Sequence, residues 1–446
     1  MPDMSIYRAY DIRGIYGETL TGRIMGDIGK ALGTFMHRRG MGGKVVVGND
    51  VRYSSPGLSK ALRKGLSTTG VRVLNAGTTS FGVALFAGME ERAVTAYITA
   101  SHNPPEWNGV KLFGPDCVGF LEKDNKEVGR LVSEGKFRRG TAQKGRKMDY
   151  RDRYKEFMCS RFKISRPLKI VVDCGNGAAS IVAPWLFRAL GFEAVDLFCE
   201  PDPNFPGRGP DVTEESCRCL MEAVTRTGAD MGLAFDGDGD RVAMVDEKGK
   251  YVHADMMAVA LGREMLKAGP GKVVCNVDCS MLMERLLGPL GAEVVRIPVG
   301  NTFMMRNVME HGAVFGSESS HHYVLPSYLP FDDGMVAGLK MAEMLSLSGS
   351  PLSSFFDGLS PLPRKAGEFA CPDGRKDNVM KGVETALSKQ HRVIAIDGVG
   401  VSLDDGWGLV RPSNTSPVIR VTAEGETRAA MEDIYSRLSR AVMEAI

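Results

Sequence analysis

The sequence predicts an α/β protein of four domains, three similar ones built on mixed β-sheets and a smaller α+β domain at the C-terminal end. A chain of 446 residues is too long for a single hydrophobic core. One pattern, a β-branched strand, a helix closed by glycine and a second strand, occurs three times. The C-terminal segment follows a different plan, which predicts a domain of another kind.

The repeated pattern begins at Lys44, Lys169 and Lys272. The expected first strands are 44–48, 169–173 and 272–275, the helices are 55–68, 182–190 and 280–290, and the second strands are 71–74, 192–195 and 292–295. Strand, crossover helix and strand with nearly continuous Val and Ile form the βαβ unit of a sheet buried on both faces. The copies start at domain-sized intervals, so we expect three α/β domains.

The C-terminal segment predicts a helix from about Gly367, strands near Val393 and Val401, a loop, a strand at 418–421 and a final helix from Thr427. Apolar residues in that last helix recur every three or four positions, which is typical of one buried face. We expect linkers near 140–147, 247–251 and 360–365. The predicted domains are therefore 1–147, 148–248, 249–363 and 364–446.

The composition excludes several functional classes. Lys plus Arg number 56 and Asp plus Glu 54, so no global basic field points to nucleic acid. The short basic run Lys136–Arg139 is expected to be a solvated linker. No apolar run reaches the length of a membrane span and no signal sequence is recognisable, so we expect a cytoplasmic protein without a membrane partner. The nine cysteines lack metal or disulfide spacing and are expected to be buried thiols.

The stretch Thr99 to Pro105 places reactive side chains at the end of a predicted strand, 92–98. Pro104 and Pro105 cannot continue a central strand, so the chain turns there. Ser101 stands where the strand ends, His102 follows it, and Lys111 lies ten residues further on. A hydroxyl with an imidazole and an amine nearby suggests a nucleophile or a phosphate carrier. A polar turn with no chemistry is the other interpretation.

The segment Phe235–Arg241 carries three carboxylates, Asp236, Asp238 and Asp240, separated by glycines. Carboxylates crowded on one loop repel each other unless a cation lies between them. Oxygen ligands favour Mg²⁺ or Ca²⁺ over zinc. An EF-hand would need glycine where Arg241 stands, so we predict a magnesium site of another type.

Two further segments predict substrate contacts. After an expected strand at 312–314, Glu318, Ser320 and His322 alternate, so an extended segment would turn them to one side, where they suit the hydroxyl groups of a sugar. A polar edge strand explains this spacing equally well. The segment 410–417 offers the donors of a phosphate clamp or of an ordinary turn. Its donors are Arg411, Ser413, Asn414 and Thr415.

These four motifs, in this order and one per predicted domain, resemble the α-D-phosphohexomutase superfamily of phosphomannomutases and phosphoglucomutases. The resemblance implies four domains around a central cleft and an isomerase that interconverts sugar 1-phosphates and 6-phosphates. It further implies an active-site phosphoserine, a sugar bisphosphate that serves as intermediate and activator, and Mg²⁺ as cofactor. Mannose and glucose phosphates are the expected substrates.

The resemblance also implies a role for each motif residue. Ser101 is the phosphoserine, and it holds Mg²⁺ together with Asp236, Asp238 and Asp240. The residues expected near the transferred phosphoryl group are Arg13, His102, Lys111 and Arg241. Those expected to bind the sugar are Glu318, Ser320 and His322, and those expected to bind the substrate phosphate are Arg411, Ser413, Asn414 and Thr415.

Three positions depart from the pattern of this superfamily: Asn301 and Asp278, where histidine and lysine are common, and His321, where glycine is usual. Asn301 cannot act as a general base, which leaves Lys111 or His322 for that role. The departures keep other functions open: a mutase for glucosamine or pentose phosphates, a catalytically silent phosphosugar-binding protein, and a phosphatase. The sequence does not indicate an oligomeric state.

Overall fold

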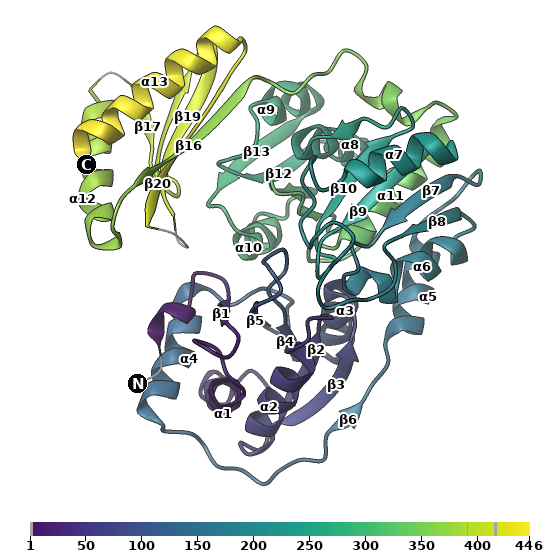
Figure 1. Cartoon of the computed structure of the whole chain (residues 1–446), viewed down its shortest axis with the longest axis vertical. Helices are drawn as coiled ribbons and strands as arrows, with labels where there is room; N and C mark the ends of the chain where they lie inside the picture. Colours follow the sequence, from purple (N-terminus) through teal and green to yellow (C-terminus); the bar gives the residue numbers. More distant parts are fainter. Residues whose placement is uncertain (1–2, 390, 414–416) are drawn as a thin grey trace. The chain divides into compact units, whose positions relative to one another are not determined.

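The computed structural model describes residues 3–389, 391–413 and 417–446 (Figure 1). The chain folds into two compact units. One consists of residues 1–252 with 321–357, and the other of residues 253–320 with 358–446. Each unit contains two of the expected domain types, which confirms the predicted class of three mixed α/β domains and an α+β domain.

The N-terminal sheet of the first unit has six strands in the order β1-β5-β4-β2-β3-β6. β2 is parallel to β3 and β4, whereas β5 is antiparallel to both β4 and β1. Helices α1, α2 and α4 contribute to one large core cluster against this sheet. The strands are β1 (Ile12–Ile15), β2 (Lys44–Asn49), β3 (Arg72–Thr78), β4 (Val94–Ile98), β5 (Trp107–Phe113) and β6 (Arg146–Lys147), and the helices are α1 (Gly22–Arg39), α2 (Ser55–Ser67), α3 (Phe81–Glu91) and α4 (Glu122–Glu134).

The second sheet of the first unit has the order β11-β10-β9-β7-β8, with β7 parallel to β8 and β9. β9, β10 and β11 form successive antiparallel pairs, so the segment 247–251, expected as a linker, is the turn of a hairpin. The elements of this sheet and its helices are α5 (Arg151–Arg161), β7 (Lys169–Asp173), α6 (Ala183–Ala189), β8 (Glu193–Leu197), α7 (Arg218–Thr227), β9 (Met231–Phe235), β10 (Val242–Asp246) and β11 (Tyr251–Val252). The first unit also contains the short strand β15 (Tyr323–Val324), which is not part of this sheet, and helix α11 (Gly334–Ser348).

In the second unit, β12 pairs in parallel with β13 and with β14. These strands and their helices are α8 (Ala254–Leu266), β12 (Gly271–Asn276), α9 (Leu282–Leu287), β13 (Ala292–Ile297), α10 (Asn301–His311) and β14 (Phe315–Ser317). The C-terminal sheet is antiparallel, in the order β16-β20-β19-β18-β17, and α12 and α13 share its core (Figure 1). Its elements are β16 (Arg364–Ala370), α12 (Asp373–Leu387), β17 (Val393–Ile394), β18 (Val399–Leu403), β19 (Gly406–Pro412), β20 (Val418–Gly425) and α13 (Arg428–Ala445).

Two predictions for the C-terminal domain were wrong. Residues near Gly367 form strand β16 and not the start of a helix, because its charged side chains line a half-exposed edge strand paired only with β20. The expected loop before residue 418 contains strand β19. Its glycines hide the strand pattern, and a Cβ on Gly406 would lie 2.3 Å from the backbone carbonyl oxygen of Glu424, so the strand needs glycine there to pair with β20.

Two further expectations can be compared with the structure. All nine cysteines are free thiols, and most are buried, but Cys219 is exposed. Within the described ranges, no helix combines the length and the apolar character needed to cross a membrane.

Candidate active site

The chain turns sharply at Ser101, just after β4. Ser101 has a φ of 51°, a left-handed conformation that is strained for a residue with a side chain. Its backbone N–H donates to Oγ1 of Thr99 at 2.8 Å. The hydroxyl is buried and donates to Oδ2 of Asp236 at 2.9 Å, and it lies 3.4 Å from Nδ1 of His102. The structure therefore brings the predicted nucleophile against the predicted metal loop.

Arg52, which sequence reasoning missed, holds this turn in place. Its side chain is fully buried, and Nε donates to Asp50 at 3.1 Å. Its terminal nitrogens donate to the carbonyl oxygens of Ser101, Asn103 and Pro104 at 2.6–2.7 Å. Because these partners are backbone atoms, no pairing pattern reveals them. Asp50 and Arg52 are a charged pair directly after β2, and this could have indicated the site, because binding sites of α/β proteins lie at the ends of strands.

The aspartate loop follows β9, and its glycines are required by close packing. A Cβ on Gly237 would lie 2.4 Å from the carbonyl oxygen of Ser101, so only glycine lets the two loops meet. Gly239 has a φ of 84°, which favours glycine. Oδ1 of Asp236 accepts hydrogen bonds from the backbone N–H groups of Gly239 and Arg241, at 2.9 and 3.2 Å, which fixes the curl of the loop.

The three loop carboxylates fit a divalent cation. Asp236, Asp238 and Asp240 are buried, and one ligand oxygen from each lies within 4.8 Å of the others. Oδ1 of Asp238 and Oδ1 of Asp240 accept no hydrogen bond from any described residue. Burial first, and then the charges of Asp240 and Asp238, raise the pKa of Asp236 well above its usual range. Unsatisfied hard oxygens in a buried acidic loop are what Mg²⁺ or Ca²⁺ binds.

Lys111 supplies a buried positive charge opposite these carboxylates. Its Nζ lies 2.6 Å from Oδ2 of Asp240 and 3.3 Å from Oδ2 of Asp238. Burial alone would lower the pKa of Lys111, but Asp238 and Asp240 outweigh it and raise the pKa. Lys111 is thus held as an ammonium ion, which suits charge neutralisation better than the role of a general base.

Further cations surround His102. The charge of Arg241 first, then burial and the charge of Arg13, lower the pKa of His102, so this imidazole is neutral. Arg13 donates to Asn103 Oδ1 at 3.0 Å and pairs with Asp11 at 2.6 Å, while its buried Nε has no hydrogen-bond partner among the described residues. A depressed histidine pKa and an unused guanidinium donor mark a place of positive potential that favours an anion.

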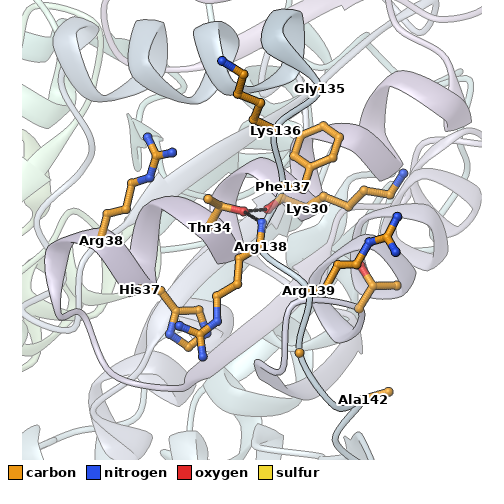
Figure 2. Close-up of a pocket in the computed structure, with 12 residues that line it drawn as sticks. Lys30, Thr34, His37, Arg38, Gly135, Lys136, Phe137, Arg138, Arg139 and Ala142 are labelled. Carbon is orange, nitrogen blue, oxygen red and sulfur yellow. Dashed lines mark hydrogen bonds between the residues drawn. The ribbon is translucent and has the colours of Figure 1, made fainter.

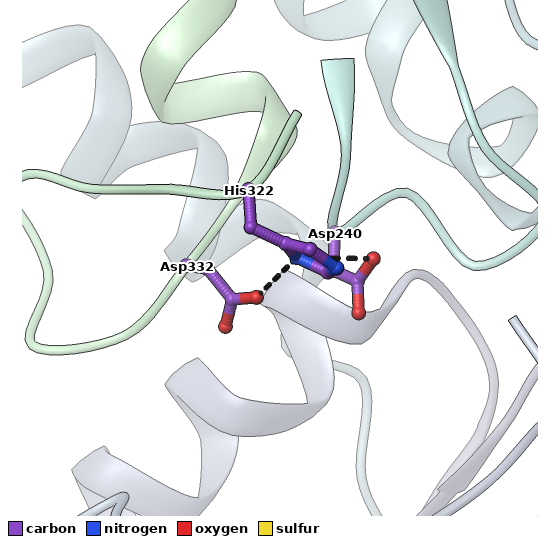
Figure 3. A group of neighbouring side chains, drawn as sticks. All are labelled: Asp240, His322 and Asp332. Carbon is purple, nitrogen blue, oxygen red and sulfur yellow. Dashed lines mark ion pairs between the residues drawn. The ribbon is translucent and has the colours of Figure 1, made fainter. Parts of the chain in front are cut away.

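His322 lies between two aspartates, Asp240 and Asp332 (Figure 3). Nδ1 of His322 is 2.6 Å from Oδ2 of Asp332 and 3.7 Å from Oδ1 of Asp240. Nε of Arg241 donates to Nε2 of His322 at 2.9 Å. Because the guanidinium keeps its proton, Nε2 acts as acceptor, which leaves the proton of a neutral ring on Nδ1, beside Asp332. The cluster Asp240, His322 and Asp332 therefore resembles an oriented acid–base pair more than a metal site.

The segment that follows β14 is a turn and not the expected extended strand. His321 has a φ of 68°, so the alternation of Glu318, Ser320 and His322 does not place them on one side of a strand. Within the second unit, Glu318 is buried and accepts from the N–H of Gly300 at 2.7 Å, and Oγ of Ser320 donates to it at 3.3 Å. Glu318 and Ser320 thus form one polar pair.

His321 fills a buried position in the first unit. Its Nε2 lies 2.6 Å from Oη of Tyr251, which also donates to the carbonyl of Val212 at 2.8 Å. Its Nδ1 lies 3.3 Å from Oη of Tyr323. Its carbonyl accepts from the N–H of Val242, just after the aspartate loop, at 3.3 Å. The side chain offsets the strain of its left-handed conformation by these contacts.

Asp278 and Asn301, the other two departures, have places in the second unit. Oδ1 of Asp278 pairs with Arg364 at 2.7 Å, and its Oδ2 accepts from Ser319 at 3.3 Å. This residue therefore links the side chain of Ser319, in the sugar loop, to that of Arg364 at the start of β16. Asn301 opens helix α10, directly after the N–H of Gly300 that contacts Glu318.

The expected phosphate loop follows β19. Nη1 of Arg411 donates to Asp397 at 3.0 Å, and Asp397 also accepts from the N–H of Val299 at 3.2 Å. Ser413 is buried, and its carbonyl accepts from Nζ of Lys376 at 2.5 Å. The remaining two predicted residues of this loop, Asn414 and Thr415, lie outside the described residues.

The sequence matches four protein-family models, one after another along the chain. Models for phosphoglucomutase/phosphomannomutase α/β/α domains I, II and III match residues 4–139, 149–249 and 253–361, and the model for the C-terminal domain matches 368–441. Probable phosphoglucosamine mutases from Methanothermobacter thermautotrophicus and Methanopyrus kandleri are 37% and 36% identical, over 96% and 95% of this chain and 95% and 94% of theirs.

A solved structure is similar over the same length. The phosphoglucomutase/phosphomannomutase family protein from Burkholderia thailandensis superposes with a TM-score of 0.92 at 31% identity, covering 100% of this chain and 98% of that one. The four ordered motifs, the buried serine–aspartate contact and these matches agree. The chain belongs to the phosphoglucomutase/phosphomannomutase family and is an enzyme of the phosphohexomutase superfamily.

Proposed function

We propose that the protein is a phosphoglucosamine mutase that moves a phosphoryl group between O1 and O6 of glucosamine by way of a phosphoserine at Ser101. The contact between Ser101 Oγ and Asp236 Oδ2, 2.9 Å long, carries the proposal, because it puts a hydroxyl at the edge of a cation site. The names of the relatives favour glucosamine over the mannose and glucose phosphates expected from the sequence.

The charges in the first unit suit phosphoryl transfer. Asp236, Asp238 and Asp240 would hold Mg²⁺ together with an oxygen on Ser101, and the ion would neutralise charge on the phosphoryl oxygens when bound. Lys111, already paired with the carboxylates, keeps the loop compact, and the unused Nε of Arg13 can donate to a phosphoryl oxygen. Positioning and charge neutralisation are the main requirements of this chemistry.

Each transfer needs a proton acceptor, and we assign this role to His322. The pairing of Nδ1 with Asp332 orients the ring and leaves Nε2 as the basic atom. Burial acts to lower the pKa of His322, but the charges of Asp240 and Asp332 together outweigh it and raise the pKa. In the transfer, Nε2 takes the proton of the sugar hydroxyl as its oxygen bonds to phosphorus and the phosphorus–oxygen bond at Ser101 breaks. The freed Ser101 oxygen takes up a proton, and His322 releases its own to solvent, so that a serine hydroxyl and a neutral imidazole remain. Arg241 must first turn from His322 towards the phosphate.

The product of that transfer is a sugar bisphosphate, and its other phosphoryl group must return to Ser101 to complete the isomerisation. The sugar must therefore be held in two orientations. Glu318 and Ser320 suit hydroxyl contacts in both, and Arg411 with Ser413, Asn414 and Thr415 are proposed to hold the phosphate that is not transferred.

The test is a panel of sugar phosphates. Purified protein with Mg²⁺ and a trace of glucosamine 1,6-bisphosphate should convert glucosamine 6-phosphate to the 1-phosphate with a higher kcat/KM than mannose, glucose or ribose phosphates. A preference for another sugar would reject the substrate assignment. A silent binding protein would be stabilised by these ligands without transferring label to Ser101, and a phosphatase would release free phosphate faster than isomer.

A further inference from the structure

A cavity lies on the N-terminal domain, apart from the residues of the candidate active site. It has a volume of about 1040 Å³ and is lined by helix α1 and by the segment 135–142, which follows α4 (Figure 2). The lining side chains that carry or can carry positive charge are Lys30, His37, Arg38, Lys136, Arg138 and Arg139. No aspartate or glutamate is among the lining residues.

Most of the positive charges that line this groove have no carboxylate partner among the described residues. Lys30 pairs with Asp27 at 2.8 Å. Arg38, Lys136, Arg138 and Arg139 are exposed and make no ion pair with any residue in the described ranges. Most other arginines near α1 and α4 do have carboxylate partners, as Arg39 has Glu127 at 2.7 Å. Positive charges gathered around one groove produce a positive potential, which a bound anion would neutralise.

The backbone that presents these cations is fixed, although the sequence alone predicts a solvated linker here. The N–H of Arg138 donates to Oγ1 of Thr34 on α1 at 2.9 Å, a contact drawn in Figure 2. The N–H of Gly140 donates to the carbonyl of Thr68 at 3.0 Å. Phe137 packs against the core of this domain, and Nζ of Lys30 lies 5.4 Å from its ring centroid. The groove is therefore preformed, which lowers the entropic cost of binding.

Size and charge together define the ligand. A cavity of this volume holds a metabolite-sized molecule, since ligand pockets typically measure about 300–1,000 Å³. The chain as a whole carries a formal charge of only +2, so the positive potential is local to the groove and is no stripe for a long nucleic acid. We propose that the groove binds a small anion with several phosphate groups, an oligophosphate, independently of the sugar-phosphate site.

Isothermal titration calorimetry with tripolyphosphate and with ATP, in the presence of saturating sugar bisphosphate, tests this proposal. We expect one site on the wild-type protein that weakens as salt is added. The triple variant K136Q/R138Q/R139Q should bind at least tenfold more weakly. The matched variant K60Q/K64Q/K123Q, which removes the same charge from exposed positions of α2 and α4, should bind as the wild type does.

Thermal melts check that the variants are folded, and Arg38→Glu provides an independent variant on the helix side of the groove. Equal affinity for ATP and tripolyphosphate would support recognition of phosphates alone, and tighter ATP binding would support added contact with Phe137. Absence of binding to the wild type, equal binding by the triple variant, or displacement by sugar bisphosphate would overturn the proposal. So would tighter binding of a single-stranded oligonucleotide. Mutase activity of the triple variant should stay unchanged, so failure of this proposal is separate from failure of the proposed function.

Discussion

The two units use their polar residues in different ways. In the first unit, the charges around Ser101 are buried and oppose one another: Lys111 faces Asp238 and Asp240, and carboxylate oxygens remain without hydrogen bonds from described residues. In the second unit, the polar side chains proposed to contact the sugar and its phosphate already have neutral or charged partners. Glu318 accepts from Gly300 and Ser320, and Arg411 donates to Asp397.

This difference separates the residues proposed to take part in the chemical step from those proposed to bind the substrate. An unsatisfied buried cluster is costly unless an ion or a phosphoryl group completes it, so its residues should be indispensable for turnover. Side chains with alternative partners can exchange them for a ligand at moderate cost, so their loss should change affinity and selectivity more than the reaction itself. The predictions below test this division, from the largest expected effect to the smallest.

Replacing Ser101 with alanine should have the largest effect. The variant lacks the oxygen that would carry the phosphoryl group, so kcat should fall by about 10⁴-fold or more. A coupled assay for the sugar 1-phosphate, together with intact-mass measurement of the phosphorylated protein, checks this. Ser133→Ala, which removes an exposed hydroxyl on α4, is the control and should keep wild-type turnover. Turnover of Ser101→Ala within tenfold of wild type would contradict the proposed carrier.

Replacing Lys111 with methionine should reduce both stability and activity. Removing one partner of a buried ion pair leaves carboxylates uncompensated and costs about 3–5 kcal/mol in the free energy of unfolding. Because Mg²⁺ bound at the same carboxylates would replace the missing charge, adding Mg²⁺ should restore much of the loss in Tm.

The matched control is Lys340→Met, which removes another buried lysine, paired with Glu343 at 2.8 Å. Its Tm should also fall, but Mg²⁺ should not restore it, because no acidic cluster surrounds that pair among the residues that the structure describes. Equal rescue of both variants, or of neither, would argue against a cation site at the aspartate loop.

Whether a structural feature could be predicted from the sequence depends on whether it produces a recognisable pattern of residue types. The three βαβ units were predictable because buried parallel strands read as continuous runs of Val and Ile. Strands β16 and β19 were not, because the charged residues of an edge strand and the closely packed glycines hide that pattern.

The site shows the same limit. The clustered aspartates and Ser101 are visible as motifs, and the structure places them in contact. The contacts of Arg52 with backbone carbonyls leave no trace in residue types. The left-handed turn at His321 redirects His322 towards Arg241 and Asp332, which alternation along a strand could not foresee.

Replacing Glu318 with glutamine should have a smaller effect than the changes in the first unit. The amide keeps an acceptor for the N–H of Gly300 but loses the charge, and a hydrogen bond to a charged group is worth about 1.5–3 kcal/mol. We expect kcat/KM for glucosamine 6-phosphate to fall about 10–100-fold, with most of the change in KM. Glu368→Gln on strand β16 is the control and should not change either constant. A loss confined to kcat would place Glu318 in the chemical step and break the division.

The change with the smallest expected effect on turnover concerns the stability of the second unit and its dependence on pH. Burial raises the pKa of Asp255 to about 6, and its Oδ1 accepts from the N–H of Ser280 at 2.9 Å. Between pH 4 and 6 the folded protein keeps a proton that the unfolded chain, with the ordinary value of 3.8, has lost. The contribution of Asp255 to the free energy of unfolding therefore falls as pH rises through this window, by about 3 kcal/mol.

The side chain of Asp255→Asn stays neutral at every pH in this window, and its oxygen can still accept from the N–H of Ser280. The variant should therefore be more stable than the wild type at pH 7.5 and close to it at pH 4, as measured by urea unfolding at both values. Asp357→Asn, at an exposed position, is the control. Its free energy of unfolding should differ from that of the wild type by the same amount at pH 4 and at pH 7.5. A stability difference for Asp255→Asn that is the same at both pH values would mean that the buried carboxyl is not protonated in the folded state. The second unit would then carry an uncompensated buried charge as the first does, and the contrast between the two units would fail.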